Sequence, residues 1–122
     1  MVEQLDFSTA LESCRNGGGE LVKISSEEEN NYVKAIANNA QPWIGLEKKT
    51  ADGSFSWTDG SGLFFNELDG SEDANLYCVG MKDDGKWTVT SCSSTHISIC
   101  EQSKLKNYKA KKILSVKIIF ES

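Results

Sequence analysis

The chain has 122 residues, of which 39% are hydrophobic, and a formal net charge of -5. This length fits one compact domain around one hydrophobic core. The acidic balance argues against nucleic acid as a partner, because such binding depends on basic groups that neutralise phosphates. No apolar run is long enough to span a bilayer, so we expect no transmembrane segment.

The first part of the chain has the apolar spacing of two short helices. The first helix ends at the glycine run 17–19 and carries a stripe formed by Phe7, Ala10, Leu11 and Cys14. Thr9 with Glu12 fits a capping box, but Asp6 is a second candidate for the cap. The second helix is predicted to begin after Ser26 and to end before Pro42, with apolar positions at Val33, Ile36, Ala37 and Ala40.

From residue 43 onward, short runs rich in aromatic and β-branched residues alternate with Asp-Gly turns, which is typical of antiparallel β-structure. The predicted strands are 43–46, 54–58, 77–81, 86–90 and 97–101. Asp84-Gly85 lies between two of them and is predicted to be a hairpin turn. The irregular connection 59–77 is long for a compact domain, and such loops are often functional. We therefore expect the ligand site there.

The four cysteines, at positions 14, 78, 92 and 100, can form two disulfides that reinforce a thin core in an oxidising compartment. A zinc site is disfavoured, since no pair has CxxC spacing and His96 is the only histidine. Free cytosolic thiols remain an alternative. We expect secretion, and because the opening residues MVEQLDF do not resemble a signal peptide, the leader of a secreted form would be removed ahead of them.

Seven short motifs occur in the order known from one family: ALESC, GGGELVKISS with EEN behind it, WIGL, SWTDGS, CVGM, DGKW and ISICE. Together with the four cysteines, this series from about Phe7 to Glu101 resembles the C-type lectin-like domain. The resemblance implies an α+β fold in which two helices flank two small antiparallel sheets, with a long loop that carries the ligand site. It also implies the disulfides Cys14–Cys100 and Cys78–Cys92.

The chain departs from this family where its calcium-dependent members hold the ion. Those members have a Glu-Pro-Asn or Gln-Pro-Asp triplet in the loop, a carboxylate two residues before the next cysteine, and an Asn-Asp pair after a strand tryptophan. Here these places hold Gly-Ser-Glu-Asp at 70–73, Leu76 and Thr88-Val89. Because calcium needs six to eight oxygen ligands, we predict neither a calcium-bridged sugar at this location nor a metal cofactor. A different calcium site is the alternative, built from Glu67, Asp69, Glu72, Asp73 and Asn75.

The predicted lectin-like domain covers residues 1–101, and the first strand of the family is largely missing from it. Residues 102–122 form a C-terminal extension with a lysine-rich linker, 104–112, and a β-prone run, 114–120. We hypothesise that this run pairs antiparallel with 97–101 and replaces the missing strand. The alternatives are a disordered extension and a segment that is ordered only in a dimer.

Enzymatic activity is not expected, because the chain has one histidine and neither a GxSxG motif nor a phosphate-binding loop.

The first functional hypothesis is a calcium-independent extracellular module that recognises a protein or a second copy of itself. The alternative is a carbohydrate-binding lectin with a rearranged loop 59–77, in which Phe64, Phe65 and Tyr77 stack on sugars. A third hypothesis is that residues 88–95 form a surface that binds ice or a mineral. The predicted ligand-binding residues are Asn66, Glu67, Asp69, Glu72, Asp73, Asn75, Tyr77, Lys86 and Thr88.

Overall fold

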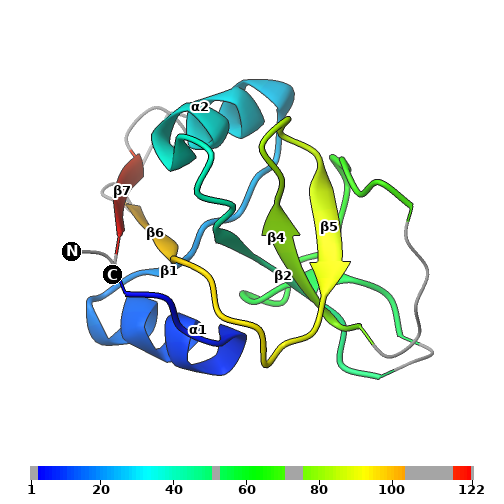
Figure 1. The fold of residues 1–122 in the computed structure, drawn as a ribbon, viewed down its shortest axis with the longest axis horizontal. Coiled ribbons are helices and arrows are strands. Elements are labelled where there is room, and N and C mark those ends of the chain that lie inside the picture. Colours follow the sequence, from blue (N-terminus) through cyan, green and yellow to red (C-terminus); the bar gives the residue numbers. More distant parts are fainter. Residues whose placement is uncertain (1–2, 51–52, 71–75, 104–116, 122) are drawn as a thin grey trace.

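A computed structural model describes residues 3–50, 53–70, 76–103 and 117–121 of the chain (Figure 1). The two helices in these ranges are α1 (Phe7–Asn16) and α2 (Glu27–Ala37), and neither is long and apolar enough to cross a bilayer. The described strands are β1 (Glu20–Leu21), β2 (Trp43–Glu47), β3 (Ser56–Trp57), β4 (Cys78–Met81), β5 (Trp87–Thr90), β6 (Ile99–Ser103) and β7 (Lys117–Glu121).

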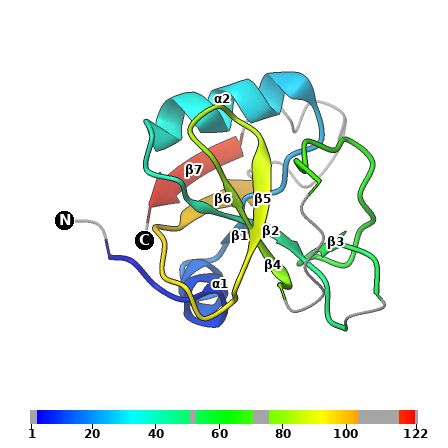
Figure 2. The same ribbon diagram turned by 45° about the vertical axis from the view of Figure 1, so that its right-hand side comes forward.

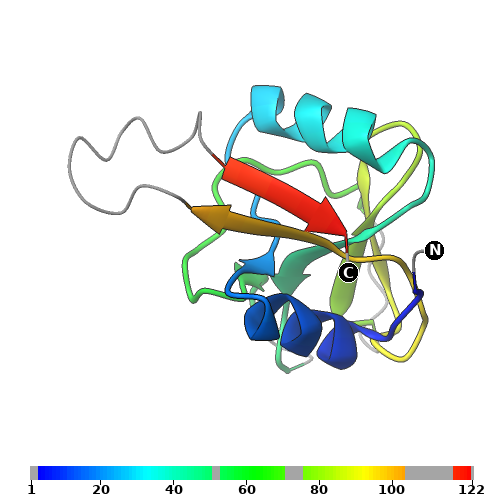
Figure 3. The same ribbon diagram turned by 90° about the vertical axis from the view of Figure 1, so that its left-hand side faces the viewer.

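The strands form two antiparallel sheets. One has the order β1-β6-β7 and the other the order β3-β2-β4-β5. Figure 3 shows α1 and α2 on opposite sides of the β6–β7 pair, and Figure 2 shows the β4–β5 hairpin in front of the three-stranded sheet. The predicted fold class, two helices flanking two small antiparallel sheets, is therefore confirmed.

The helix boundaries follow from local hydrogen bonds. Asp6 is the N-cap of α1, because its Oδ1 accepts a hydrogen bond from the Thr9 N–H at 2.9 Å. Ser26 caps α2 as predicted and accepts from the Glu29 N–H at 3.1 Å. The prediction that Pro42 ends this helix, with Ala40 in its apolar stripe, was wrong. It ends at Ala37, since Asn38 adopts the left-handed conformation that stops a helix.

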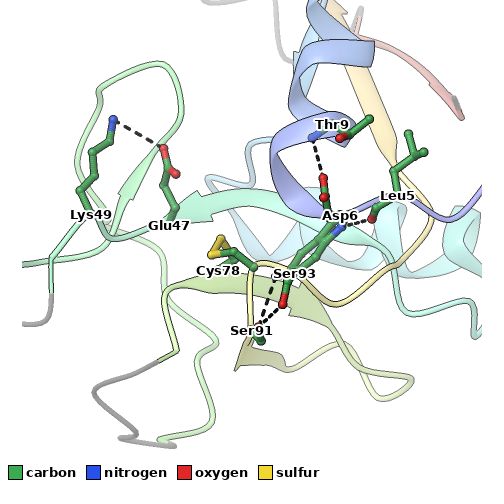
Figure 4. Close-up of a disulfide and its surroundings, with 10 residues drawn as sticks. Leu5, Asp6, Thr9, Glu47, Lys49, Cys78, Ser91 and Ser93 are labelled. Atoms are coloured by element: carbon green, nitrogen blue, oxygen red, sulfur yellow. Dashed lines mark hydrogen bonds and ion pairs between the residues drawn. A yellow bond between two sulfur atoms is a disulfide. The ribbon is translucent and has the colours of Figure 1, made fainter.

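Both disulfides have the pairing that the family resemblance implies. Cys14–Cys100 joins α1 to β6 with a Cα–Cα distance of 5.4 Å, and Cys78–Cys92 joins β4 to the segment after β5 with 5.1 Å. Figure 4 shows Cys78 near the start of α1 and near the hydrogen bond between Ser91 and Ser93. The long bridge thus links the beginning of the lectin-like part to its end, and the short bridge links the two sides of the β4–β5 hairpin.

Two adjoining clusters of buried side chains form the core. The first joins α1 to β1 and β6; within it Trp43 is fully buried, lies edge-on to Phe7 with a ring-centre distance of 5.2 Å, and donates its indole N–H to the Leu5 carbonyl. The second joins α2 to the four-stranded sheet and contains Trp57 and Trp87 at a ring-centre distance of 5.6 Å. Both clusters place large aromatic rings where the sheets meet the helices.

The strand β7 pairs antiparallel with β6, in a register that sets Ile99 opposite Glu121 and Ser103 opposite Lys117. The hypothesis from the sequence was a pairing of 114–120 with 97–101. The whole lysine-rich linker, 104–112, and residues 114–116 lie outside the described residues. The division into a domain at 1–101 and an extension at 102–122 stays a prediction.

Candidate functional site

The long loop starts at a turn that is fixed to the core. Asp59 Oδ1 accepts hydrogen bonds from the N–H of Ser61 at 2.9 Å and from its hydroxyl at 2.6 Å. Gly60 has a φ of 93°, which favours glycine, and the Trp57 N–H donates to the Ser61 carbonyl. Since Trp57 is buried, the beginning of the loop is held at a defined position.

The middle of the loop lies along the free edge of β5. The Trp87 N–H donates to the Glu67 carbonyl at 2.9 Å, and the Asp69 N–H donates to the Trp87 carbonyl at 3.0 Å. Leu68 and Trp87 form a parallel bridge, and Asn66 supports it because its side-chain oxygen accepts from the Leu68 N–H. The described loop therefore extends the four-stranded sheet by a short stretch and sets the positions of its side chains.

Two ion pairs connect this loop to the β4–β5 hairpin. Lys86 Nζ lies 2.9 Å from Glu67 Oε1, and Lys82 Nζ lies 2.5 Å from Asp69 Oδ2. These hydrogen bonds raise the pKa of both lysines above the ordinary value, so both ammonium groups stay charged at neutral pH. The predicted residues Glu67, Asp69 and Lys86 are thus brought together, and the sequence analysis missed Lys82.

The two phenylalanines of the loop have different environments. Phe65 packs against Trp87 with a ring-centre distance of 5.9 Å and belongs to the rim of the core. The next side chain toward the N-terminus, Phe64, is 91% exposed. Of the three rings that the lectin hypothesis named, Phe64 is the most exposed.

Tyr77 lies apart from the ion pairs. It precedes β4, and its ring lies 5.8 Å from Lys48 Nζ, whereas Lys82 and Lys86 are at the other end of the hairpin. Thr88 follows the buried Trp87 on β5 and is half-buried. The predicted ligand-binding residues therefore do not form one cluster in the described part of the chain.

Three of the predicted residues, Glu72, Asp73 and Asn75, lie outside the described residues. Within the described ranges, no three His, Cys, Asp or Glu residues are placed so that they could hold a metal ion. Of the alternative calcium site, only Glu67 and Asp69 can be located, and each of them contacts a lysine.

A second feature, missed by the sequence analysis, is a hollow of about 140 Å³ beside β1, lined by Glu20, Leu21, Lys23, Trp57, Thr58, Asp59 and Glu101. Glu20 accepts hydrogen bonds from Arg15 Nη2 at 2.5 Å and from the Thr58 hydroxyl at 2.7 Å. Burial raises the pKa of Glu20, but these hydrogen bonds outweigh it and hold the pKa below its ordinary value. Since its carboxylates already have protein partners, we assign no ligand to this hollow.

Another residue that sequence analysis did not identify is Asn30, the buried polar residue on α2. Its side-chain oxygen accepts from the Trp87 indole N–H at 2.8 Å, and its amide donates to the Gly85 carbonyl at 2.9 Å. Asn30 therefore ties α2 to the hairpin that carries Lys82 and Lys86. A polar residue on an exposed helix face gives the same local sequence pattern, so the sequence held no signal for this role.

Solved structures with a similar fold support the architecture. A calcium-independent type II antifreeze protein has a TM-score of 0.74 and 30% identity, over 81% of this chain and 79% of that chain. The C-type carbohydrate-recognition domain of cow CD23, solved in the presence of an oligosaccharide, has a TM-score of 0.74 and 31% identity, over 81% of each chain.

Curated relatives have similar identities over one region. CD209 antigen-like protein A of Mus musculus is 31% identical over 108 residues, which are 83% of this chain and 45% of that protein. The secretory phospholipase A2 receptor of Oryctolagus cuniculus is 29% identical over 109 residues, which are 82% of this chain and 8% of that protein. The chain thus spans less than half the length of these relatives.

A family model, described as the lectin C-type domain, matches residues 3–102. Domains of this family are generally binding modules without enzymatic activity, and they are typically extracellular or parts of receptor ectodomains. The match includes both helices, six of the described strands and both disulfides. The chain belongs to the C-type lectin domain family.

Proposed function

We propose that this domain recognises a protein partner without calcium, in the oxidising extracellular surroundings where its two disulfides persist. The binding surface is the outer side of the long loop and the neighbouring hairpin, which we call the loop face. Its residues are Phe64, Asn66, Glu67, Asp69, Lys82, Lys86 and Thr88. The loop face includes every described member of the predicted set except Tyr77.

The observation that carries this proposal is the pair of lysine–carboxylate contacts. Calcium binds where several uncompensated oxygen ligands converge, usually with more than one carboxylate. Here the ammonium groups of Lys86 and Lys82 lie at Glu67 and Asp69, with N–O distances of 2.9 Å and 2.5 Å. A cation that entered would have to displace two lysines and would be repelled by them. We infer that internal ammonium groups supply the positive charge that a calcium ion supplies elsewhere.

Phe64 supports a protein as the partner. Phe64 is 91% exposed, and it precedes the ion-paired Glu67 by three residues in the loop. Aromatic side chains surrounded by polar groups are frequent anchors of protein interfaces, and burying such a ring contributes roughly 1.5–3 kcal/mol. The loop face is thus suited to a partner with an apolar pocket bordered by charges of both signs.

A glycan is the second candidate, and the same ring supports it. An exposed aromatic face can stack on a sugar, and the exposed Asn66 lies two residues away along the loop. The cow CD23 domain, a similar structure, was solved in the presence of an oligosaccharide. In this case binding would still not require calcium, because the lysine contacts are the same.

An array of extracellular protein domains and a glycan array, both probed with and without chelator, test the proposal. We expect binding to a protein domain that is unchanged by chelator. Phe64→Ala should weaken this binding by about tenfold or more, because an anchoring ring is lost. Binding to glycans alone would favour the second candidate.

Tyr32→Ala is the matched control, since Tyr32 is the other large apolar side chain that is strongly exposed in the described residues, at 55%, and lies on α2. This variant should bind as the wild type does. Binding that chelator abolishes, or an unchanged affinity of Phe64→Ala, would contradict the proposal.

A further inference from the structure

The side chain of Asn30 contacts the β4–β5 hairpin at two points. Asn30 lies on α2 and is buried, and its amide has a partner on each side. The amide nitrogen donates to the Gly85 carbonyl at 2.9 Å, and the amide oxygen accepts from the Trp87 indole N–H at 2.8 Å. Figure 1 shows α2 beside the turn end of this hairpin. One buried amide thus holds two residues that have different roles in the loop face.

The first of these residues, Gly85, belongs to the turn that carries the two lysines of the loop face. The Gly85 N–H donates to the Lys82 carbonyl at 2.9 Å, and the Lys82 N–H donates to the Lys86 carbonyl at 2.7 Å. The two lysines follow the paired residues Met81 and Trp87 at the end of the hairpin. Because cross-strand neighbours lie on one face of a sheet, both side chains point the same way. The turn that α2 contacts therefore sets the position of both lysines.

The second residue, Trp87, holds the loop. Its backbone N–H donates to the Glu67 carbonyl at 2.9 Å, and its carbonyl accepts from the Asp69 N–H at 3.0 Å. Its ring is fully buried and lies edge-on to Phe65 of the loop, with a ring-centre distance of 5.9 Å. The orientation of this ring and the position of the loop are thus linked through one residue, and Asn30 is the hydrogen-bond partner of its indole N–H.

We propose that Asn30 is the positioning residue of the loop face. Its amide nitrogen sets the turn with the two lysines, and its amide oxygen sets the tryptophan that holds the two carboxylates. The ion pairs Lys86–Glu67 and Lys82–Asp69 each join one of these parts to the other. The contacts between lysine and carboxylate therefore depend on how α2 places both parts. This inference rests on the proposed function, because it assigns to Asn30 a role toward the recognition surface.

The two contacts require a donor and an acceptor on one short side chain. The amide of Asn30 supplies both. An ionised aspartate of the same size keeps the acceptor for Trp87 but has no donor for the Gly85 carbonyl. A protonated carboxyl again has one O–H donor and one acceptor. Because burial raises the pKa of a carboxyl group, Asn30→Asp passes from the ionised to the protonated state as the pH is lowered.

The charged groups around this position leave the titration to burial. On α2, Lys34 lies one turn further along the helix and is exposed, so water screens its ammonium group. On the hairpin, both lysines have carboxylate partners in the loop. The Asp84 carboxylate accepts a hydrogen bond from the Lys86 backbone N–H at 2.9 Å and is thereby directed to the turn.

Hydrogen exchange of single amides in the full chain, measured without any partner, tests this inference. The Trp87 and Asp69 N–H groups report on the loop, and the Gly85 and Lys82 N–H groups report on the turn. Loops that carry binding sites open locally, so the protection of these amides reports on local structure. Asn30→Ala should lower the protection factors in both places by about tenfold or more, because the loss of one hydrogen bond corresponds to roughly this factor.

Asn30→Asp separates the two contacts. At about pH 7 the ionised carboxylate lacks the donor, so the turn amides should lose about tenfold in protection and the loop amides less. At about pH 4.5 the protonated carboxyl restores the donor, and the protection of the turn should return to within about threefold of the wild type at the same pH. Since the size of the side chain does not change, this recovery distinguishes the hydrogen bond from packing.

Leu21→Ala is the control for stability alone. Leu21 is fully buried in the other core cluster, which joins α1 to β1 and β6, and it is not part of the loop face. Its replacement leaves a cavity and destabilises the whole domain. Urea unfolding compares this loss with that of Asn30→Ala. In Leu21→Ala the protection of the Trp87 and Asp69 amides should stay within about threefold of the wild type, because their local openings do not involve Leu21.

Two results would overturn the inference. One is an equal loss of loop protection in Leu21→Ala and Asn30→Ala, and the other is an Asn30→Asp variant whose turn amides do not recover at low pH. A domain that binds nothing on the protein and glycan arrays would contradict the proposed function instead. Since no partner takes part in the exchange measurement, the two failures are distinguishable.

Discussion

Replacement of both Cys14 and Cys100 by alanine is expected to lower the free energy of unfolding by about 4 to 5 kcal/mol. The bridge closes a segment with a sequence separation of 86 residues, and removal of so long a loop restraint stabilises the unfolded chain by this amount in the chain-entropy estimate. Both residues are fully buried, where α1 meets β6. Urea unfolding followed by tryptophan fluorescence measures the change.

The second bridge provides the control for this prediction. Cys78–Cys92 has a sequence separation of only 14 residues, so its replacement by two alanines should cost about 3 kcal/mol. Since small domains are stable by roughly 5 to 15 kcal/mol, the loss of the long bridge should leave the less stable protein. A cost for the short bridge that equals or exceeds that of the long one would contradict this account.

Asn30→Ala should lower the free energy of unfolding by about 3 kcal/mol. The alanine leaves the Trp87 indole N–H and the Gly85 carbonyl without their partner, and each unsatisfied buried polar group costs about 1–3 kcal/mol. Because Asn30 connects α2 to the hairpin, the near-ultraviolet signal of Trp87 should also change. Thermal and urea unfolding of the variant measure the effect.

Asn31→Ala is the matched control on the same helix. Asn31 is exposed, and its replacement should change the stability by no more than about 0.5 kcal/mol, as is usual for surface positions. Equal stabilities of Asn30→Ala and Asn31→Ala would mean that the buried hydrogen bonds of Asn30 contribute nothing to the fold.

The helices and the hairpin could be predicted from the sequence because their signals are local. The stripe from Phe7 to Cys14 is a direct consequence of helical periodicity, and Gly85 takes the positive φ, 90°, that its hairpin turn requires. The end of α2 could not be placed in this way. Asn38 ends the helix because it adopts a left-handed conformation, but the sequence does not distinguish this from an asparagine in the last helical turn. Pro42 was therefore the only evident stop signal.

The candidate site was predicted less completely, for a physical reason. Glu67 and Lys86 were both identified, but their ion pair joins positions that are 19 residues apart, and only the folded loop brings them together. Lys82 lacked any local signal, since a lysine near a turn is usually solvated. Tyr77 is close to Lys86 along the chain, but the length of β4 separates them in space.

The most direct test of the central claim is a comparison of thermal unfolding of the wild type with added calcium and with chelator. A ligand that binds only the folded state raises the unfolding temperature as its concentration increases. Lys82 and Lys86 already neutralise Asp69 and Glu67, so we expect the same unfolding temperature under both conditions. An unfolding temperature that rises with calcium and saturates would contradict the account.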